Sequence, residues 1–174
     1  MMGQVLTYLT AINDMRSKMF TEDKKDLFRY LGKESCILAR GVSATTPKGS
    51  LLRGFKRMKQ HECYRNALIL ALQNSGLTYC EGYAESVIPI EHAWCLDQEG
   101  NVVDPTWGRK APAMPKEFIG VPFNAQWMWN KTERLERYMG AFGHDQEWTQ
   151  NPMSAEFDWE TAQAGIPEKF KKTA

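Results

Sequence analysis

The 174-residue sequence has few of the side chains that build metal or disulfide sites, with three histidines, four cysteines and no CxxC or HxxxH pair. Zinc sites favour such short paired spacings, and here only His61 and Cys63 lie close enough to supply two ligands. A disulfide framework is equally unexpected, because the chain is long and poor in cysteine. We therefore expect free thiols, no metal and no cofactor.

The sequence also lacks the continuous apolar run of about 20 residues that a membrane-spanning helix needs. Its opening segment, MMGQVLTYLTAINDMRSKMF, is amphipathic, unlike a signal peptide. Lys and Arg number 22 against 21 Asp and Glu, so the net charge of +1 gives no general attraction to nucleic acid or anionic membrane. We expect a cytoplasmic protein with neither kind of partner; the oligomeric state is left open.

Composition indicates one domain spanning residues 1–174, because 43% hydrophobic and 25% charged residues are typical of a globular chain. We divide it into a helical N-terminal part (1–40), a core motif (60–107) and a C-terminal tail (150–174). The tail mixes acids, aromatics and small residues, and it either docks as a short helix or frays.

Helical spacing of apolar residues predicts an amphipathic helix over 4–19, whose apolar side includes Val5, Leu9, Ile12, Met15 and Met19. Thr21 carries a capping hydroxyl and is followed by two acids, which predicts the start of a second helix over 22–31 that ends at Gly32. GVSATTPKGS at 41–50 predicts a loop.

The stretch from residue 48 to 59 is basic, with Lys48, Arg53, Lys56 and Arg57 and no acid between Arg40 and Lys59. It is either a patch for an acidic partner or phosphate, or a solvated surface beside a site. The balanced overall charge favours the solvated surface. Aromatic residues of the kind that stack on single-stranded nucleic acid are nearly absent from it.

A buried central helix is predicted over Cys63–Asn74, CYRNALILALQN, with Gly76 as its left-handed cap. Cys63 falls in the first turn, where unpaired backbone N–H groups and the helix dipole favour a thiolate and can bind an oxyanion. Gln60, three residues upstream, is a candidate second oxyanion donor. The alternative is that Cys63 is a small buried apolar residue, as free cysteines often are.

A strand over 77–87 and a hairpin follow this helix. The sequence IEHAWCL, an acidic turn DQEG and then NVVDPTW have the pattern of two paired strands. If the turn is centred on residues 98–99, His92 and Asp104 lie opposite each other, with Cβ atoms within roughly 5 Å. A lone histidine is often structural, and Asp-Pro often only ends a strand. Together with Cys63, however, they form the nucleophile, base and orienting acid of a catalytic triad.

The region after Trp107 is less specific. FIGVPF at 118–123 predicts a strand, which Pro122 places at the edge of the sheet. A helix follows over 124–139 and ends near Gly140; its Trp and Met residues either pack in the core or wall a cleft. His144 has no recognisable partner, and we do not expect it to be catalytic.

Four short motifs carry a family resemblance: Cys-Tyr-Arg-Asn-Ala at 63–67, Glu-Gly-Tyr at 81–83, His-Ala-Trp at 92–94 and Asp-Pro-Thr-Trp at 104–107. They resemble the transglutaminase-like branch of the papain-like cysteine enzymes, and compact chains of this pattern are similar to proteins of bacteria and phages. The resemblance covers less than a third of the chain. It implies an α+β fold with N-terminal helices and a central buried helix packed on an antiparallel sheet.

By that resemblance Cys63 is the nucleophile, His92 the general base and Asp104 its orienting acid. Candidate substrate-binding residues within the motifs are Tyr83, Trp94 and Trp107. The oxyanion-hole glutamine of the family stands at other spacings from its cysteine, so Gln60 departs from the pattern.

The resemblance implies a hydrolase or acyltransferase that attacks an amide and forms a thioester. Protein, peptide and small-amide substrates are all open, as are hydrolysis, deamidation and transfer. The alternative from another class is a non-catalytic binding or inhibitor protein on the same scaffold.

Overall fold

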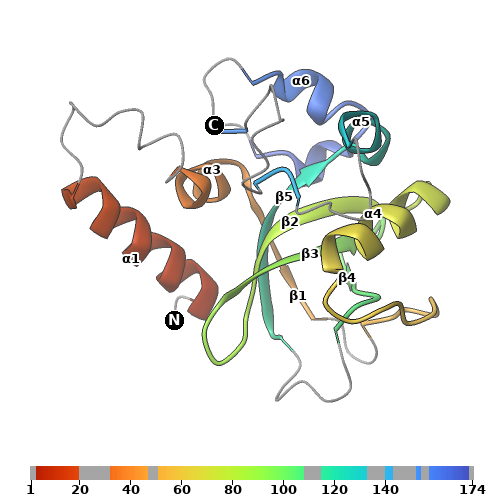
Figure 1. Ribbon diagram of the computed structural model, residues 1–174, viewed down its shortest axis with the longest axis horizontal. Helices are drawn as coiled ribbons and strands as arrows, with labels where there is room; N and C mark the ends of the chain where they lie inside the picture. The colour runs from red at the N-terminus through yellow and green to blue at the C-terminus, as the bar shows by residue number, and fades with distance from the viewer. Residues whose placement is uncertain are drawn as a thin grey trace.

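The structure is a computed structural model that describes residues 3–19, 32–46, 51–107, 115–132, 140–142, 152–153 and 157–172. The expected α+β class is confirmed, with a curled antiparallel sheet in the order β1-β5-β2-β3-β4 (Figure 1). The strands are β1 (Val42–Thr45), β2 (Thr78–Ala84), β3 (Ile90–Leu96), β4 (Val102–Val103) and β5 (Glu117–Phe123). The helices are α1 (Gln4–Met19), α3 (Lys33–Arg40), α4 (Cys63–Gln73), α5 (Ala125–Lys131) and α6 (Trp159–Ala162), with a 3-10 turn, η3, at Glu168–Phe170.

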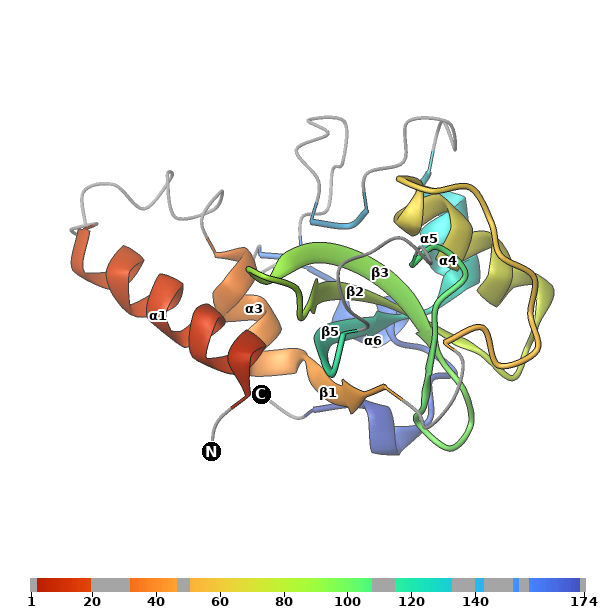
Figure 2. The same cartoon turned by 90° about the horizontal axis from the view of Figure 1, so that it is seen from below.

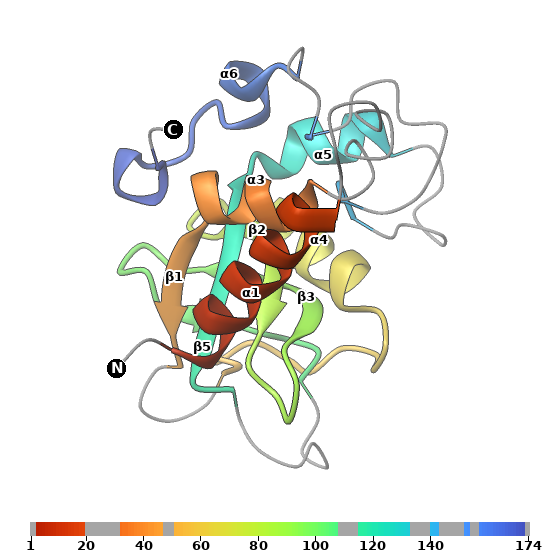
Figure 3. The same cartoon turned by 90° about the vertical axis from the view of Figure 1, so that its left-hand side faces the viewer.

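The helices pack on one face of the sheet, which we call the helical face. α1 and α3 contact β5, and α1 passes in front of it in Figure 3. α4 contacts β3 and β2 and carries α5 on its other side. Figure 2 shows how β2 and β3 arch between these two groups of helices. The opposite face is covered by a second apolar cluster that includes Leu51, Trp107, Ile166 and Phe170.

Two of the predicted helices are confirmed. α1 and α4 lie where their apolar spacing placed them, with Val5 and Leu9 fully buried. Met15, however, is 49% exposed, so it lies outside the packed side of α1. α4 ends at Asn74 in an extended conformation and does not use Gly76 as a left-handed cap. The helix predicted over 22–31 lies outside the described residues. The helix predicted over 124–139 is shorter than expected, because α5 ends at Lys131 and Thr132 is extended; residues 133–139 lie outside the described part of the chain.

The prediction of a loop over 41–50 is wrong for its first half, because Val42–Thr45 forms β1. This strand pairs with β5, so β5 lies inside the sheet and the edge position inferred from Pro122 is also wrong. The ladder from β1 ends at Gly120, before Pro122 would need to donate an N–H to it. The carbonyl of Pro122 accepts a hydrogen bond from the side chain of Gln163 at 2.9 Å instead.

Gly82 lies in the middle of the sheet, paired with His92 on one side and Gly120 on the other. A Cβ at this position would collide with the backbone of Ile119 and Gly120, so β2 and β5 can approach closely only because the residue is glycine. β2 is thereby packed closely between β5 and β3, the strand that carries His92.

We expect Gly82→Ala to lower the free energy of unfolding by roughly 2 kcal/mol or more, because a backbone clash cannot be relieved by a side-chain rotation. Urea denaturation checks this. Gly76→Ala is the matched control, since its Cβ would meet only the Gln98 amide at 3.7 Å. Equal midpoints for the two variants would contradict the close approach.

Candidate active site

Cys63 is the first residue of α4 and is half-buried. The residue before it, Glu62, makes no side-chain cap to the helix. Its carboxylate instead forms ion pairs with Lys59 and Arg65. The first turn of α4 is therefore not capped by the Glu62 side chain, and backbone N–H groups at a helix start can bind an oxyanion.

The start of α4 is fastened to the segment that follows β4. Asn66 is buried, and its amide donates to the carbonyl of Lys59 at 2.6 Å and to the hydroxyl of Thr106 at 3.0 Å. One side chain thus joins the turn before Cys63, the helix and the Asp104–Trp107 segment. Sequence reasoning missed Asn66, although a lone amide within an apolar helical run is a signal, because a buried amide needs partners.

The hairpin that carries the histidine and the aspartate forms as predicted, but its register is shifted by two. Cys95 pairs with Val103 and Leu96 with Val102, which places Asp104 beyond β4, level with Trp94 rather than with His92. The turn is centred on Glu99, and Gly100 takes the left-handed conformation at φ 91°, as in a three-residue hairpin loop.

The two side chains still meet as predicted, because a register shift of two residues leaves each of them on the same face of the sheet. His92 Nε2 and Asp104 Oδ2 are 2.7 Å apart. Asp104 is fully buried, and His92 is 5% exposed. The second carboxylate oxygen accepts backbone N–H groups from Thr106 at 2.8 Å and Trp107 at 3.1 Å. The carboxylate is thus fixed on both sides and the ring orientation is set.

The pKa values of His92 and Asp104 are shifted in opposite directions. Burial acts to lower the pKa of His92, but the Asp104 carboxylate and the nearby Cys63 side chain together raise it to about 10. Burial acts to raise the pKa of Asp104, yet His92 and the two backbone N–H donors hold it below its ordinary value. Both shifts favour an imidazolium bound to a carboxylate.

The side chain of Cys63 lies beside the imidazole of His92, close enough to help raise its pKa. Because Nε2 faces Asp104, the other ring nitrogen, Nδ1, is the one left for the sulfur. The structure therefore brings Cys63, His92 and Asp104 together in one line of contacts.

The remaining thiols have a different environment from Cys63. Cys80 and Cys95 are fully buried, and burial raises the pKa of both. Burial likewise raises the pKa of Cys36 to about 12. We expect these three cysteines to react slowly at neutral pH, so they serve as internal controls for Cys63.

Aromatic rings surround the imidazole on the face opposite the helices. Trp107 meets His92 edge-on at 5.2 Å between ring centroids, and Trp94 lies parallel to it at 6.4 Å. Trp94 is fully buried, so it supports the ring from within, whereas Trp107 is half-buried and borders the site. Of the two, Trp107 is placed to contact a substrate.

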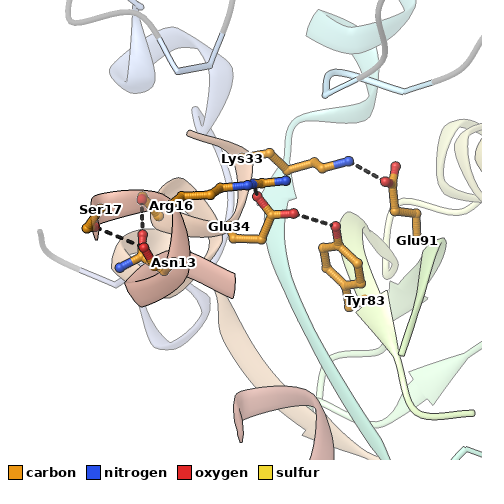
Figure 4. A network of polar contacts seen from close by, with 8 residues as sticks. Asn13, Arg16, Ser17, Lys33, Glu34, Tyr83 and Glu91 are labelled. Carbon is orange, nitrogen blue, oxygen red and sulfur yellow. Dashed lines mark hydrogen bonds and ion pairs between the residues drawn. The ribbon is translucent and has the colours of Figure 1, made fainter. Parts of the chain in front are cut away.

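Tyr83 points toward Glu34 of α3 (Figure 4). It pairs opposite Glu91, and because successive residues of a strand face opposite sides, it lies on the other face of the sheet from His92. Its hydroxyl donates to the buried Glu34 at 2.8 Å, and Glu34 also pairs with Arg16 of α1. Next to it, Lys33 pairs with Glu91, the residue before His92. The structure does not bring Tyr83 to the triad; its network docks α1 and α3 on the strand that carries His92.

Gln60 is exposed in the turn before α4. The next residue, His61, takes a left-handed conformation at φ 64°, which is uncommon for a residue with a side chain. This bend redirects the chain immediately before Cys63. The N–H groups of the α4 first turn are the oxyanion donors closest in sequence to the sulfur.

Comparisons with family models, with curated proteins and with solved structures return no match for this chain. In the part of the chain that the structure describes, no helix has the length and apolar character to cross a bilayer. Within the same residues, no three His, Cys, Asp or Glu side chains gather in a group that could hold a metal ion.

Proposed function

We propose that this chain is a cysteine-nucleophile hydrolase or acyltransferase acting on amide bonds, with a papain-like or transglutaminase-like arrangement of its site. The observation that carries the proposal is the buried 2.7 Å bond between His92 and Asp104, with the side chain of Cys63 beside the same ring. A merely structural histidine has no need of a half-buried thiol at a helix start on its other side.

The first half of the reaction forms a thioester. The Cys63 thiolate attacks the carbonyl carbon, a C–S bond forms, and the carbonyl π electrons move to the oxygen, which the first-turn N–H groups of α4 stabilise. The intermediate collapses with cleavage of the C–N bond. The departing amine takes a proton from the His92 imidazolium, and the acyl group remains on sulfur.

The second half releases the acyl group. Neutral His92 takes a proton from a water molecule or an incoming amine, whose oxygen or nitrogen attacks the thioester carbon. The C–S bond breaks, and the thiolate and the imidazolium are both restored. Asp104 holds the ring in place throughout and stays ionised. Water gives a carboxylic acid, whereas an amine gives a new amide.

An activated ester tests the proposal without knowledge of the natural substrate. We expect p-nitrophenyl acetate to give a rapid burst of p-nitrophenolate followed by slower turnover, with one acetyl group on the peptide that contains Cys63. Hydroxylamine should remove that group, as it does from thioesters. Cys63→Ser and His92→Gln should each abolish the burst.

Acetylation spread over several residues, or a burst that survives His92→Gln, would contradict a triad. The chain would then be a binding protein on this scaffold, with no acyl transfer of its own.

A further inference from the structure

A row of basic side chains borders the candidate site on the side of α4. The segment from residue 51 to 59, which we call the basic arm, runs beside the segment that follows β4. Its two ends are joined to that segment by backbone hydrogen bonds, Asp104 N–H to the Leu51 carbonyl at 2.7 Å and Met58 N–H to the Pro105 carbonyl at 2.8 Å. The arm is therefore held along the residues that orient His92.

Two basic residues of the arm are tied to segments that form the candidate site. Arg57 donates from its guanidinium to the carbonyl of Trp107, the residue whose ring meets His92 edge-on. Lys59 lies at the other end, where its carbonyl accepts from Asn66 in the first turn of α4. Lys56, between Arg53 and Arg57, is exposed.

Within the described residues, acidic side chains do not balance this charge. Over residues 51–66 the only acid is Glu62, which already pairs with Lys59 and Arg65. Arg53 is neutralised by Asp97 at 3.1 Å, so we leave it out of the row. On the other side of His92, Glu91 is paired with Lys33. Only one carboxylate, that of Glu62, therefore offsets four cations in this stretch: Lys56, Arg57, Lys59 and Arg65. The electrostatic potential beside the site is positive as a result.

We infer that the acyl group is taken from a peptide segment that carries carboxylates next to the reacting amide, and that the basic arm selects it. The inference rests on the proposed function, and it names a substrate class for that site. Charged groups at the rim of a site mainly raise the association rate and exclude the wrong partner. An acidic segment is drawn in, whereas a lysine-rich segment is repelled.

Two alkylating agents that differ by one charge measure this field at the sulfur itself. With either reagent the sulfur forms a bond to the methylene carbon and iodide leaves. Iodoacetate is an anion, whereas iodoacetamide is neutral. Their rate ratio at Cys63 separates local charge from intrinsic reactivity. The test variant combines Lys56→Glu with Lys59→Gln, and the matched control combines Lys18→Glu on α1 with Lys169→Gln on η3, which removes the same charge elsewhere.

We expect the test variant to lower the iodoacetate-to-iodoacetamide ratio about fourfold at low salt, the order produced by three unit charges about 10 Å away in water. The control should leave the ratio unchanged, and high salt should bring wild type toward the test variant. Oligoglutamate should also protect Cys63 from iodoacetamide better than oligolysine does.

Equal ratios in the two double variants would overturn the inference while leaving the triad intact, because iodoacetamide alone reports the reactivity of the sulfur. Protection by oligothymidylate but not by oligoglutamate would also overturn it, and would assign the arm to nucleic acid. Failure of the proposed function would look different: Cys63 would react with iodoacetamide no faster than the buried cysteines.

Discussion

Replacing His92 with glutamine should slow the alkylation of Cys63 by iodoacetamide about 100-fold near pH 6. At this pH an ordinary thiol is ionised to well under about 1%, because its pKa is about 8.5. A sulfur hydrogen-bonded to an imidazolium reacts as the thiolate instead. Quenched alkylation followed by peptide mass analysis gives the rate at each cysteine separately.

His61→Gln is the matched control for this variant. His61 is exposed and lies only two residues before Cys63, so the control removes a nearby imidazole without touching the triad. We expect it to react at the wild-type rate. Comparable losses in the two variants, or fast labelling of the buried Cys80 and Cys95, would show that the reactivity does not come from His92.

The second large effect is on stability. We expect Asp104→Asn to lower the free energy of unfolding at neutral pH by about 3 kcal/mol, the cost of leaving one partner of a buried ion pair uncompensated. The backbone N–H groups of Thr106 and Trp107 would still find an amide oxygen, so the loss reports mainly the bond to His92. Asp14→Asn, an exposed acid on α1, is the control and should change little.

The pH dependence of this loss has a definite sign. The pKa of His92 is raised in the folded state to about 10, so its contribution is complete below its ordinary pKa and is lost as the pH rises toward 10. The pKa of Asp104 is lowered, so its contribution is present above its ordinary pKa and is lost as the pH falls through the lower folded value. The two titrations report one interaction and are not added.

Urea denaturation over a pH series therefore should show the greatest difference between wild type and Asp104→Asn from about pH 4 to about pH 6.5. The difference should shrink steadily toward about pH 10. A difference that is constant across this range would mean that Asp104 acts through its backbone contacts alone.

Two helices, α1 and α4, and the candidate triad residues could be predicted from the sequence because each has a local cause. The apolar spacing of α1 and the Ala/Leu run of α4 fix which sides are buried. On β3 and β4 the alternation of side chains kept His92 and Asp104 on one face even though the register was wrong by two. That error came from the turn, where Asp97 accepts the N–H groups of Glu99 and Asn101 and moves the centre by one residue.

What the sequence did not reveal depends on contacts between distant segments. β1 is short and rich in small residues, and it is a strand because β5 pairs with it. α3 begins at Gly32 without a side-chain cap, so it lacks the usual start signal. Tyr83 resembled a site residue in its motif, but pairing opposite Glu91 turns it to the helical face, where Glu34 binds it.

The most direct measurement of the central claim is the titration of the His92 ring by nitrogen NMR in wild type and in Cys63→Ala. We expect both ring nitrogens of the folded wild-type protein to remain protonated above about pH 8, well beyond the ordinary pKa of about 6.5, and the Cys63→Ala variant to lose its proton at lower pH. A ring that titrates near its ordinary pKa in both proteins would contradict a shared proton network of sulfur, imidazole and carboxylate.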